Sequence, residues 1–383
     1  MLLSHFTPPA KVLRFLLSWR LRQPRSRPST GFTLVELLVA IIVAALVITP
    51  LLGLAVNLLQ TDRQENAKAT SEQELQAAAD FMARDLQQAI YIYDAAALTR
   101  NSNINDAVNS GIRDQIPPVA QEVGACTTAN CVPVLVFWKR RSITDAVPFE
   151  NNTVNCTNAS NADDCNDTFV YSLVAYYLIF DQPGPTTVWS RTARISRFEI
   201  NDGVRFQIAD NNGAGGQLIE EVNVNQSKLR QSPGFAFFNL RLSGATLHGK
   251  LNRWQKAPAN FTANNAQPMQ ILVDYIDQSP PNGSGNPPQG LDTEDCPAGD
   301  IPNLSPAEPL WTKSPAAGVL PARVNDSFYA CINRTGNAAR IYLRGNALAR
   351  IRPVDNPPEY GQRTASFFPT TRVEVRGVGK LVQ

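Results

Sequence analysis

The chain has 383 residues, with 35 Lys and Arg against 33 Asp and Glu, and a formal net charge of +2. Residues 1–31 contain six of the positive charges and no acidic residue, so their removal takes the net charge from +2 to −4. Proteins that bind nucleic acid or other polyanions usually carry an excess of positive charge. The net charge of the chain after residue 31 therefore gives no support to such a role, and no nucleic-acid partner is expected.

Residues 1–31 form a basic leader. Its positive charges are Lys11, Arg14, Arg20, Arg22, Arg25 and Arg27. Lys and Arg beside a membrane helix favour the cytoplasmic side, so we expect the leader to stay in the cytoplasm and the chain after the helix to be exported. The apolar patch Val12–Trp19 is too short to cross a bilayer.

Residues 32–60 form an apolar stretch in which Glu36 is the single ionisable side chain. At about 1.5 Å per residue a helix over this stretch reaches roughly 42 Å, which exceeds a hydrocarbon core of about 30 Å. A carboxylate in lipid is costly and usually has a partner and a function; the alternative is an ordinary signal anchor whose Glu reaches the headgroups. Pro50 removes a helical hydrogen bond and predicts a kink.

The segment Gly31-Phe32-Thr33-Leu34-Val35-Glu36-Leu37-Leu38 resembles the cleavage and N-methylation site of type IV prepilins and of type II secretion pseudopilins. The resemblance implies that a prepilin peptidase cleaves after Gly31 and methylates the new amine of Phe32. It also implies that Glu36 neutralises the amine of a neighbouring subunit as the helix leaves the membrane lipid and joins a filament. The implied partners are the peptidase, other pilins or pseudopilins, and an assembly platform in the inner membrane.

Residues 61–98 are predicted to continue this helix as an amphipathic half, to about Ala97. Apolar residues spaced by three or four lie on one face, and they are Leu75, Ala79, Met82, Leu86, Ile90 and Tyr93. The segment Arg84-Asp85-Leu86-Gln87-Gln88-Ala89 resembles J-type minor pseudopilins and W-type minor pilins. The alternative is simply a charged helix face.

Residues 99–383 are predicted to form an exported β-rich head, so the expected fold class is α+β: a long pilin helix packed on an antiparallel sheet. Segments rich in β-branched and aromatic residues predict strands, and they are 132–138, 169–180, 188–200, 204–208, 235–242, 269–276, 340–343 and 372–376. Loops are predicted by composition at 101–115, at 151–168 and at 277–322, which contains ten prolines.

Two segments of the head carry further resemblances. Tyr176–Leu178 followed by Val188–Arg191 predicts a hairpin similar to one in the head of J-type pseudopilins. Ile341–Arg350 resembles a segment of the cyanobacterial pseudopilins of hormogonium polysaccharide secretion, although an edge strand ending in a Gly turn would have similar residues.

All six cysteines follow the apolar stretch and are therefore expected in an oxidising compartment. They are Cys126, Cys131, Cys156, Cys165, Cys296 and Cys331. Fifteen pairings exist; the first two neighbouring pairs would each close a short loop, which leaves Cys296 for Cys331. A zinc site is disfavoured because zinc ligands usually occur as closely spaced pairs with His support.

No catalytic motif or cofactor fingerprint is present, and we expect no enzyme activity and no cofactor. His248 is the one exported His, and we expect a surface or capping role for it. Acidic loop clusters are weak calcium candidates; one is Asp163, Asp164 and Asp167, and the other is Asp292, Glu294, Asp295 and Asp300.

These observations favour a minor pilin or pseudopilin of a type IV pilus-like or type II secretion-like filament. We expect a single-pass membrane protein that aids export of a surface polysaccharide and the gliding motility linked to it. The alternatives are an adhesin or enzyme head on a pilin anchor, and a DNA-uptake pseudopilin that would use Arg363, Arg372, Arg376 and Lys380.

Overall fold

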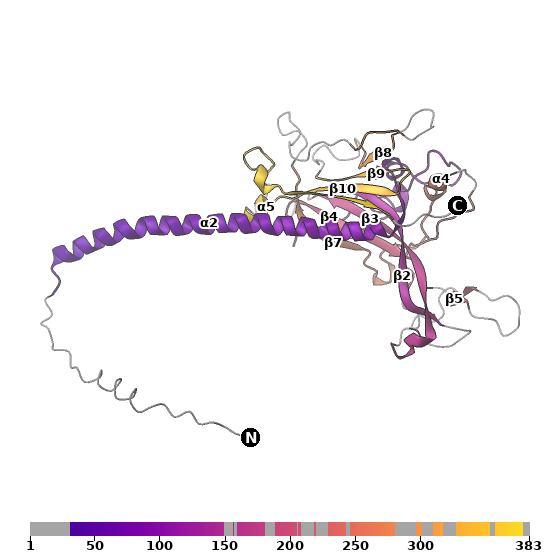
Figure 1. The fold of residues 1–383 in the computed structure, drawn as a ribbon, viewed down its shortest axis with the longest axis horizontal. Coiled ribbons are helices and arrows are strands. Elements are labelled where there is room, and N and C mark those ends of the chain that lie inside the picture. The colour runs from indigo at the N-terminus through magenta and orange to yellow at the C-terminus, as the bar shows by residue number, and fades with distance from the viewer. Residues whose placement is uncertain are drawn as a thin grey trace, which may run out of the picture. The chain divides into compact units, whose positions relative to one another are not determined.

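The longest element in a computed structural model of the protein is helix α2 (Leu34–Gln87), which has 54 residues (Figure 1). The structure describes residues 31–148, 156, 159–180, 188–204, 206–207, 218–219, 229–242, 246–279, 296–300, 309–316, 327–352 and 357–377. The leader before Gly31, most of the Pro-rich loop 277–322, and Lys380 lie outside the described residues. The chain divides into two units, Met1–Thr61 and Asp62–Gln383.

Helix α2 ends ten residues earlier than the sequence predicted. It stops at Gln87, and Ala89–Ile92 forms strand β1, which pairs with β2 through Tyr91 and Trp138. Ile90 and Tyr93 are therefore not on the helix. Their spacing fits a helix, but β-branched and aromatic residues also suit a half-buried strand, and pairing with β2 decides between the two.

The second unit contains a five-stranded antiparallel sheet in the order β1-β2-β3-β4-β7. Its strands after β1 are β2 (Cys131–Pro148), β3 (Cys165–Ile179), β4 (Ala193–Asn201) and β7 (Met269–Ile276). Two predictions need correction here. β3 begins inside the predicted loop 151–168, and its hairpin partner is β4, with Tyr176 opposite Arg197, instead of Val188–Arg191.

A four-stranded antiparallel sheet has the order β11-β10-β9-β8. Its strands are β8 (Trp311–Ser314), β9 (Phe328–Asn333), β10 (Ala338–Arg344) and β11 (Thr370–Arg376). The sequence predicted β10 and β11 but not the short strands β8 and β9. The remaining elements are β5 (Phe206–Gln207) with β6 (Leu218–Ile219), α3 (Ala95–Thr99), α4 (Leu247–Leu251), α5 (Leu348–Ile351), and the 3-10 turns Arg113–Gln115, Ala159–Asp164, Ala263–Asn265 and Ala365–Phe367.

The main core lies between the carboxyl-terminal part of α2 and both sheets. The helix contributes Leu75, Met82 and Leu86, which are 0–2% exposed and meet side chains such as Val134 of β2 and Ile341 of β10. Each such burial contributes about 1.5–3 kcal/mol. The face predicted for this half of the helix is therefore the buried face, and it holds the head together.

The other face of the five-stranded sheet is covered by irregular chain. Trp138 of β2 contacts Phe235, Phe238 and Trp254 with edge-to-face geometry, at centroid distances of 5.9, 5.0 and 5.5 Å. The prediction of a strand at 235–242 is thus wrong: this segment has no strand and instead packs over the sheet as irregular chain. Its aromatic enrichment reflects packing onto Trp138, since aromatic residues dominate buried contact area wherever they lie.

A buried ionic cluster joins α2 to the five-stranded sheet. The Asp85 carboxylate accepts hydrogen bonds from Lys139 Nζ (2.9 Å), Arg197 Nε (2.7 Å) and the Tyr176 hydroxyl (2.7 Å). Glu199 completes the cluster, with Oε2 at 2.6 Å from Arg197 Nη2 and Oε1 at 3.1 Å from Lys139 Nζ. Two carboxylates thus face two cations in a largely buried interface.

The charges of this cluster set the pKa values of its carboxyl groups. Burial by itself raises the pKa of Asp85, but the hydrogen bonds and positive charges of Arg197 and Lys139 outweigh it, so the pKa lies below its ordinary value. The same balance lowers the pKa of Glu199. Both groups are therefore ionised in the folded protein at neutral pH.

We expect Asp85→Asn to destabilise the head by about 3 kcal/mol, because removing one member of a buried ion pair leaves the others without compensation. Urea unfolding of the full-length protein in detergent, followed by Trp fluorescence, measures this. Asp80→Asn is the matched control: Asp80 is an exposed residue of the same helix, and its change should stay within about 0.5 kcal/mol. Equal effects of the two substitutions would contradict the assigned role of Asp85.

We also expect the stability of the head to fall in acid. A carboxyl group whose folded-state pKa is lowered stabilises the protein above its unfolded-state pKa, which is about 3.9 for Asp and 4.3 for Glu. This stabilisation is lost as pH falls through the lower folded-state pKa values. Unfolding free energies at about pH 7 and about pH 3 measure the loss. The variant Asp85→Asn/Glu199→Gln should lose less over this interval than the native chain, and an equal loss would refute this origin.

Candidate functional site: the N-terminal motif and the exposed part of helix α2

The start of α2 is fixed by Thr33, a residue that the sequence analysis did not single out. The Glu36 amide donates to Thr33 Oγ1 (3.2 Å), and the Leu37 amide donates to the Thr33 carbonyl (3.1 Å). Thr33 with Glu36 has the spacing of a capping box, which was the signal available in the sequence. The cap places Gly31 and Phe32 just before the first helical turn.

Among the described residues, nothing near Gly31 requires a glycine at this position. A Cβ atom added there would meet no atom within 4 Å, and both Gly31 and Phe32 are exposed. The peptide bond between them is therefore accessible on a non-helical segment. A glycine that the fold does not require is what a peptidase with a small pocket would require.

Glu36 lies in the first turn of α2. A carboxylate there interacts favourably with the positive end of the helix dipole. The residues around it are apolar and exposed: Phe32 is 79% exposed and Leu34 is 82% exposed, and large exposed hydrophobic residues continue to Leu59. The site is thus a single acidic group near the start of a long, predominantly apolar stretch of helix that has no other charged side chain up to Leu59.

This apolar surface is long enough to cross a bilayer. α2 meets the length and composition expected of one membrane span, and its apolar window is unburied. An exposed apolar surface of this size marks a site covered by lipid or by another protein. Pro50 lies inside the continuous helical segment and has no N–H for the carbonyl of Leu46; the kink there remains a prediction.

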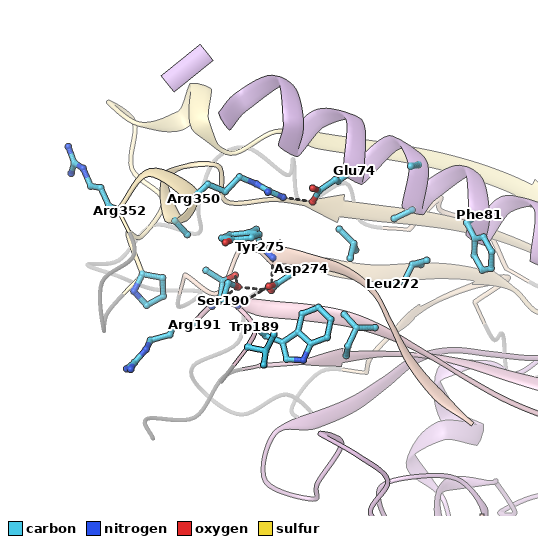
Figure 2. Close-up of a pocket in the computed structure, with 18 of the residues that line it drawn as sticks. Glu74, Phe81, Trp189, Ser190, Arg191, Leu272, Asp274, Tyr275, Arg350 and Arg352 are labelled. Atoms are coloured by element: carbon cyan, nitrogen blue, oxygen red, sulfur yellow. Dashed lines mark hydrogen bonds and ion pairs between the residues drawn. The ribbon is translucent and has the colours of Figure 1, made fainter. Parts of the chain in front are cut away.

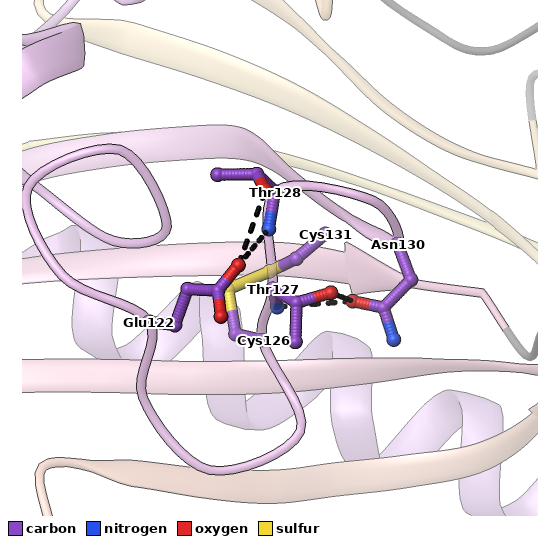
Figure 3. Close-up of a disulfide and its surroundings, with 6 residues drawn as sticks. All are labelled: Glu122, Cys126, Thr127, Thr128, Asn130 and Cys131. Carbon is purple, nitrogen blue, oxygen red and sulfur yellow. Dashed lines mark hydrogen bonds between the residues drawn. A yellow bond between two sulfur atoms is a disulfide. The ribbon is translucent and has the colours of Figure 1, made fainter.

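The structure contains three disulfides, Cys126–Cys131, Cys156–Cys165 and Cys296–Cys331, which are the pairs that spacing favoured. Figure 3 shows the first of them beneath a small loop in which Thr128 donates to Glu122. Cys131 and Cys165 are the first residues of β2 and β3. The first two disulfides thus attach loops to strand ends, and the third reaches Cys331 within β9.

The structure does not support the first calcium candidate. Asp163, Asp164 and Asp167 are exposed, and Asp167 accepts a hydrogen bond from the Asp145 amide at 2.9 Å. Among the residues that the structure describes, no three acidic, His or Cys side chains gather as metal ligands. Of the second candidate, Asp292, Glu294 and Asp295 lie outside the described residues.

His248, on α4, contacts β1. Its Nδ1 lies 2.7 Å from the Tyr91 hydroxyl, and its Nε2 lies 3.0 Å from Asn252 Nδ2. Burial raises the pKa of Tyr91 well above its ordinary value, so the phenol stays neutral and is a poor nucleophile. The arrangement fastens α4 against the sheet.

Comparison with known proteins identifies the N-terminal site. Residues 26–52 match the family described as the prokaryotic N-terminal methylation motif, and that match includes Gly31, Phe32, Glu36 and Pro50. No curated protein and no solved structure matches the chain. The chain carries the prepilin motif that is typical of type IV pilins and pseudopilins, which are structural filament subunits.

We expect the mature protein to begin at Phe32 and to carry a methyl group on its amine. Intact mass measurement and N-terminal sequencing of the protein from its own cells test this. Gly31→Ala should be partly processed and Gly31→Leu blocked, because the peptidase requires a small residue while the fold does not. An unprocessed native chain, or a first residue other than Phe32, would contradict the assignment.

Proposed function

We propose that this protein is a minor pseudopilin or pilin, of the J or W type, in a type IV pilus-like or type II secretion-like filament. The observation that carries the proposal is the isolated carboxylate of Glu36, one turn after an accessible Gly31-Phe32 bond, in the part of α2 before Gln60, which has no other charged side chain. The helix is held by lipid before assembly and by other helices after it.

Cleavage by prepilin peptidase creates a positive amine at Phe32, and the assembly platform then moves the helix from lipid into the filament. In lipid, the Glu36 carboxylate costs up to about 2.5–3.5 kcal/mol. An adjacent subunit that offers its amine removes much of this cost. The pairing therefore favours assembly.

The cargo that we propose is a surface polysaccharide, whose export is linked to gliding motility. The support is the resemblance of Ile341–Arg350 to the pseudopilins of hormogonium polysaccharide secretion. In the structure this segment runs from β10 into α5, and Arg350 binds Ser71 Oγ at 2.9 Å and also pairs with Glu74. This segment therefore contacts the helix on which the filament is built.

We expect Glu36→Leu to be cleaved, inserted and disulfide-bonded, yet to be absent from filaments and to abolish surface polymer and motility. Glu36→Asp should be intermediate, because the charge survives with a shorter reach. Immunoblots of sheared filaments and of membranes, together with polymer staining, measure these outcomes.

Glu65→Leu is the matched control for this experiment. Glu65 is an exposed carboxylate farther along the same helix and pairs with Lys68 at 2.9 Å, an interaction worth about 0.3–0.5 kcal/mol. It should assemble normally. Normal filaments from Glu36→Leu would overturn the proposal and leave a head on an ordinary membrane anchor.

A further inference from the structure

A cleft of about 1010 Å³ lies in the head between α2 and strand β7. Phe81 of the helix and Leu272 of β7 line it together with Trp189 from the segment before β4, as Figure 2 shows. Phe81 is 39% exposed and Trp189 is 43% exposed. Two large aromatic side chains thus remain accessible in a concave apolar site, which is the usual character of a binding pocket.

The cleft follows the edge of a sheet. β7 is the last strand of the five-stranded sheet, and five consecutive residues, Ile271 to Tyr275, line the cleft. Side chains of a strand alternate between its two faces, so a ligand on one face would meet only every second residue. Consecutive lining means that the cleft lies beside the strand and meets its backbone.

At its carboxyl-terminal end, the free edge of β7 is already hydrogen-bonded to another segment of the head. The Asn346 amide donates to the Tyr275 carbonyl (2.7 Å), and Ile276 forms a bridge with Gly345. The Arg350 guanidinium lies 4.1 Å from the centre of the Tyr275 ring. Within the part of the chain that the structure describes, β7 pairs with one strand of its sheet, β4, and its residues Ile271 to Asp274 line the cleft.

The rim of the cleft is positively charged. Its arginines are Arg84, Arg191, Arg350 and Arg352, and its carboxylates are Glu74 and Asp274. Glu74 pairs with Arg350, whereas Asp274 Oδ1 accepts a hydrogen bond from the neutral Ser190 Oγ at 2.5 Å. Beyond the Glu74–Arg350 pair, the rim therefore has Arg84, Arg191 and Arg352 against one carboxylate, and this excess of positive charge favours an acidic ligand.

We propose that this cleft binds an extended acidic segment of a partner protein, which adds to β7 as a further strand. Exposed sheet edges bind peptides in this way, with backbone hydrogen bonds for affinity and side-chain contacts for specificity. A bound strand would direct apolar side chains toward Phe81 and Trp189 and carboxylates toward Arg84 and Arg352. Backbone along the cleft favours a peptide over a saccharide. The proposal goes beyond the filament role and stands on the head alone.

Binding of a synthetic peptide to the full-length mature protein in detergent tests the proposal. The probe is a fluorescein-labelled eight-residue peptide that alternates Glu and Val, and anisotropy gives its Kd. Two further versions carry N-methyl groups on one or the other alternate set of amides, so each blocks one edge of the peptide. Another version replaces every Glu by Lys.

We expect the parent peptide to bind, and one of the two N-methylated versions and the Lys version to lose binding. Arg84→Glu combined with Arg352→Glu should raise Kd at least about tenfold. The matched control Arg376→Glu, an exposed arginine of β11 outside the cleft, should leave Kd unchanged.

The proposal would be overturned by any of three results. They are absence of binding by the parent peptide, equal binding of both N-methylated versions, or displacement of the peptide by a polyuronate oligosaccharide, which would make the cleft a saccharide site. These outcomes are independent of Glu36, so filament assembly and cleft binding are judged separately.

Discussion

The carboxylate of Asp85, buried where helix α2 meets the five-stranded sheet, fixes how the head is put together. It accepts hydrogen bonds from Lys139, Arg197 and Tyr176 within 2.9 Å. A buried charge tolerates little displacement, because its desolvation is offset only while its partners stay in place. Apolar packing around Leu75 and Met82 supplies most of the burial, while the ionic cluster selects one position of the helix along the sheet.

The same helix meets two chemical requirements along its length. From Leu34 to Leu59 its apolar side chains are exposed, and from Ala67 onward one face is buried in the head. The change follows composition, since polar and charged residues predominate from Gln60 onward and restrict apolar ones to a single stripe. A filament subunit needs both parts of such a helix. The apolar part can exchange lipid for other helices, while the part buried in the head keeps the head folded during this exchange.

The elements that sequence predicted well are those with a local cause. β7 matches its predicted range, and β10 and β11 lie within two residues of theirs, since enrichment in β-branched and aromatic residues marks a strand locally. The predictions of secondary structure were wrong where contacts with residues distant in sequence determine the conformation. Helix and strand patterns both fit Ile90, and the aromatic residues of 235–242 cover Trp138 without forming a strand. β8 has only four residues, too few for a periodic signal.

Sequence alone was enough to find the prepilin motif, the long apolar helix and the single charge near its start, and to predict that the mature chain begins at Phe32. These features arise from neighbouring residues, so spacing along the chain was enough to find them. Only the tertiary structure decided which groups surround Asp85, since Tyr176 and Arg197 lie 91 and 112 positions away from it. The cleft beside β7 likewise joins α2, the segment before β4 and α5. Its walls are distant in sequence, and only the packing of helix on sheet brings an apolar floor and an arginine rim together.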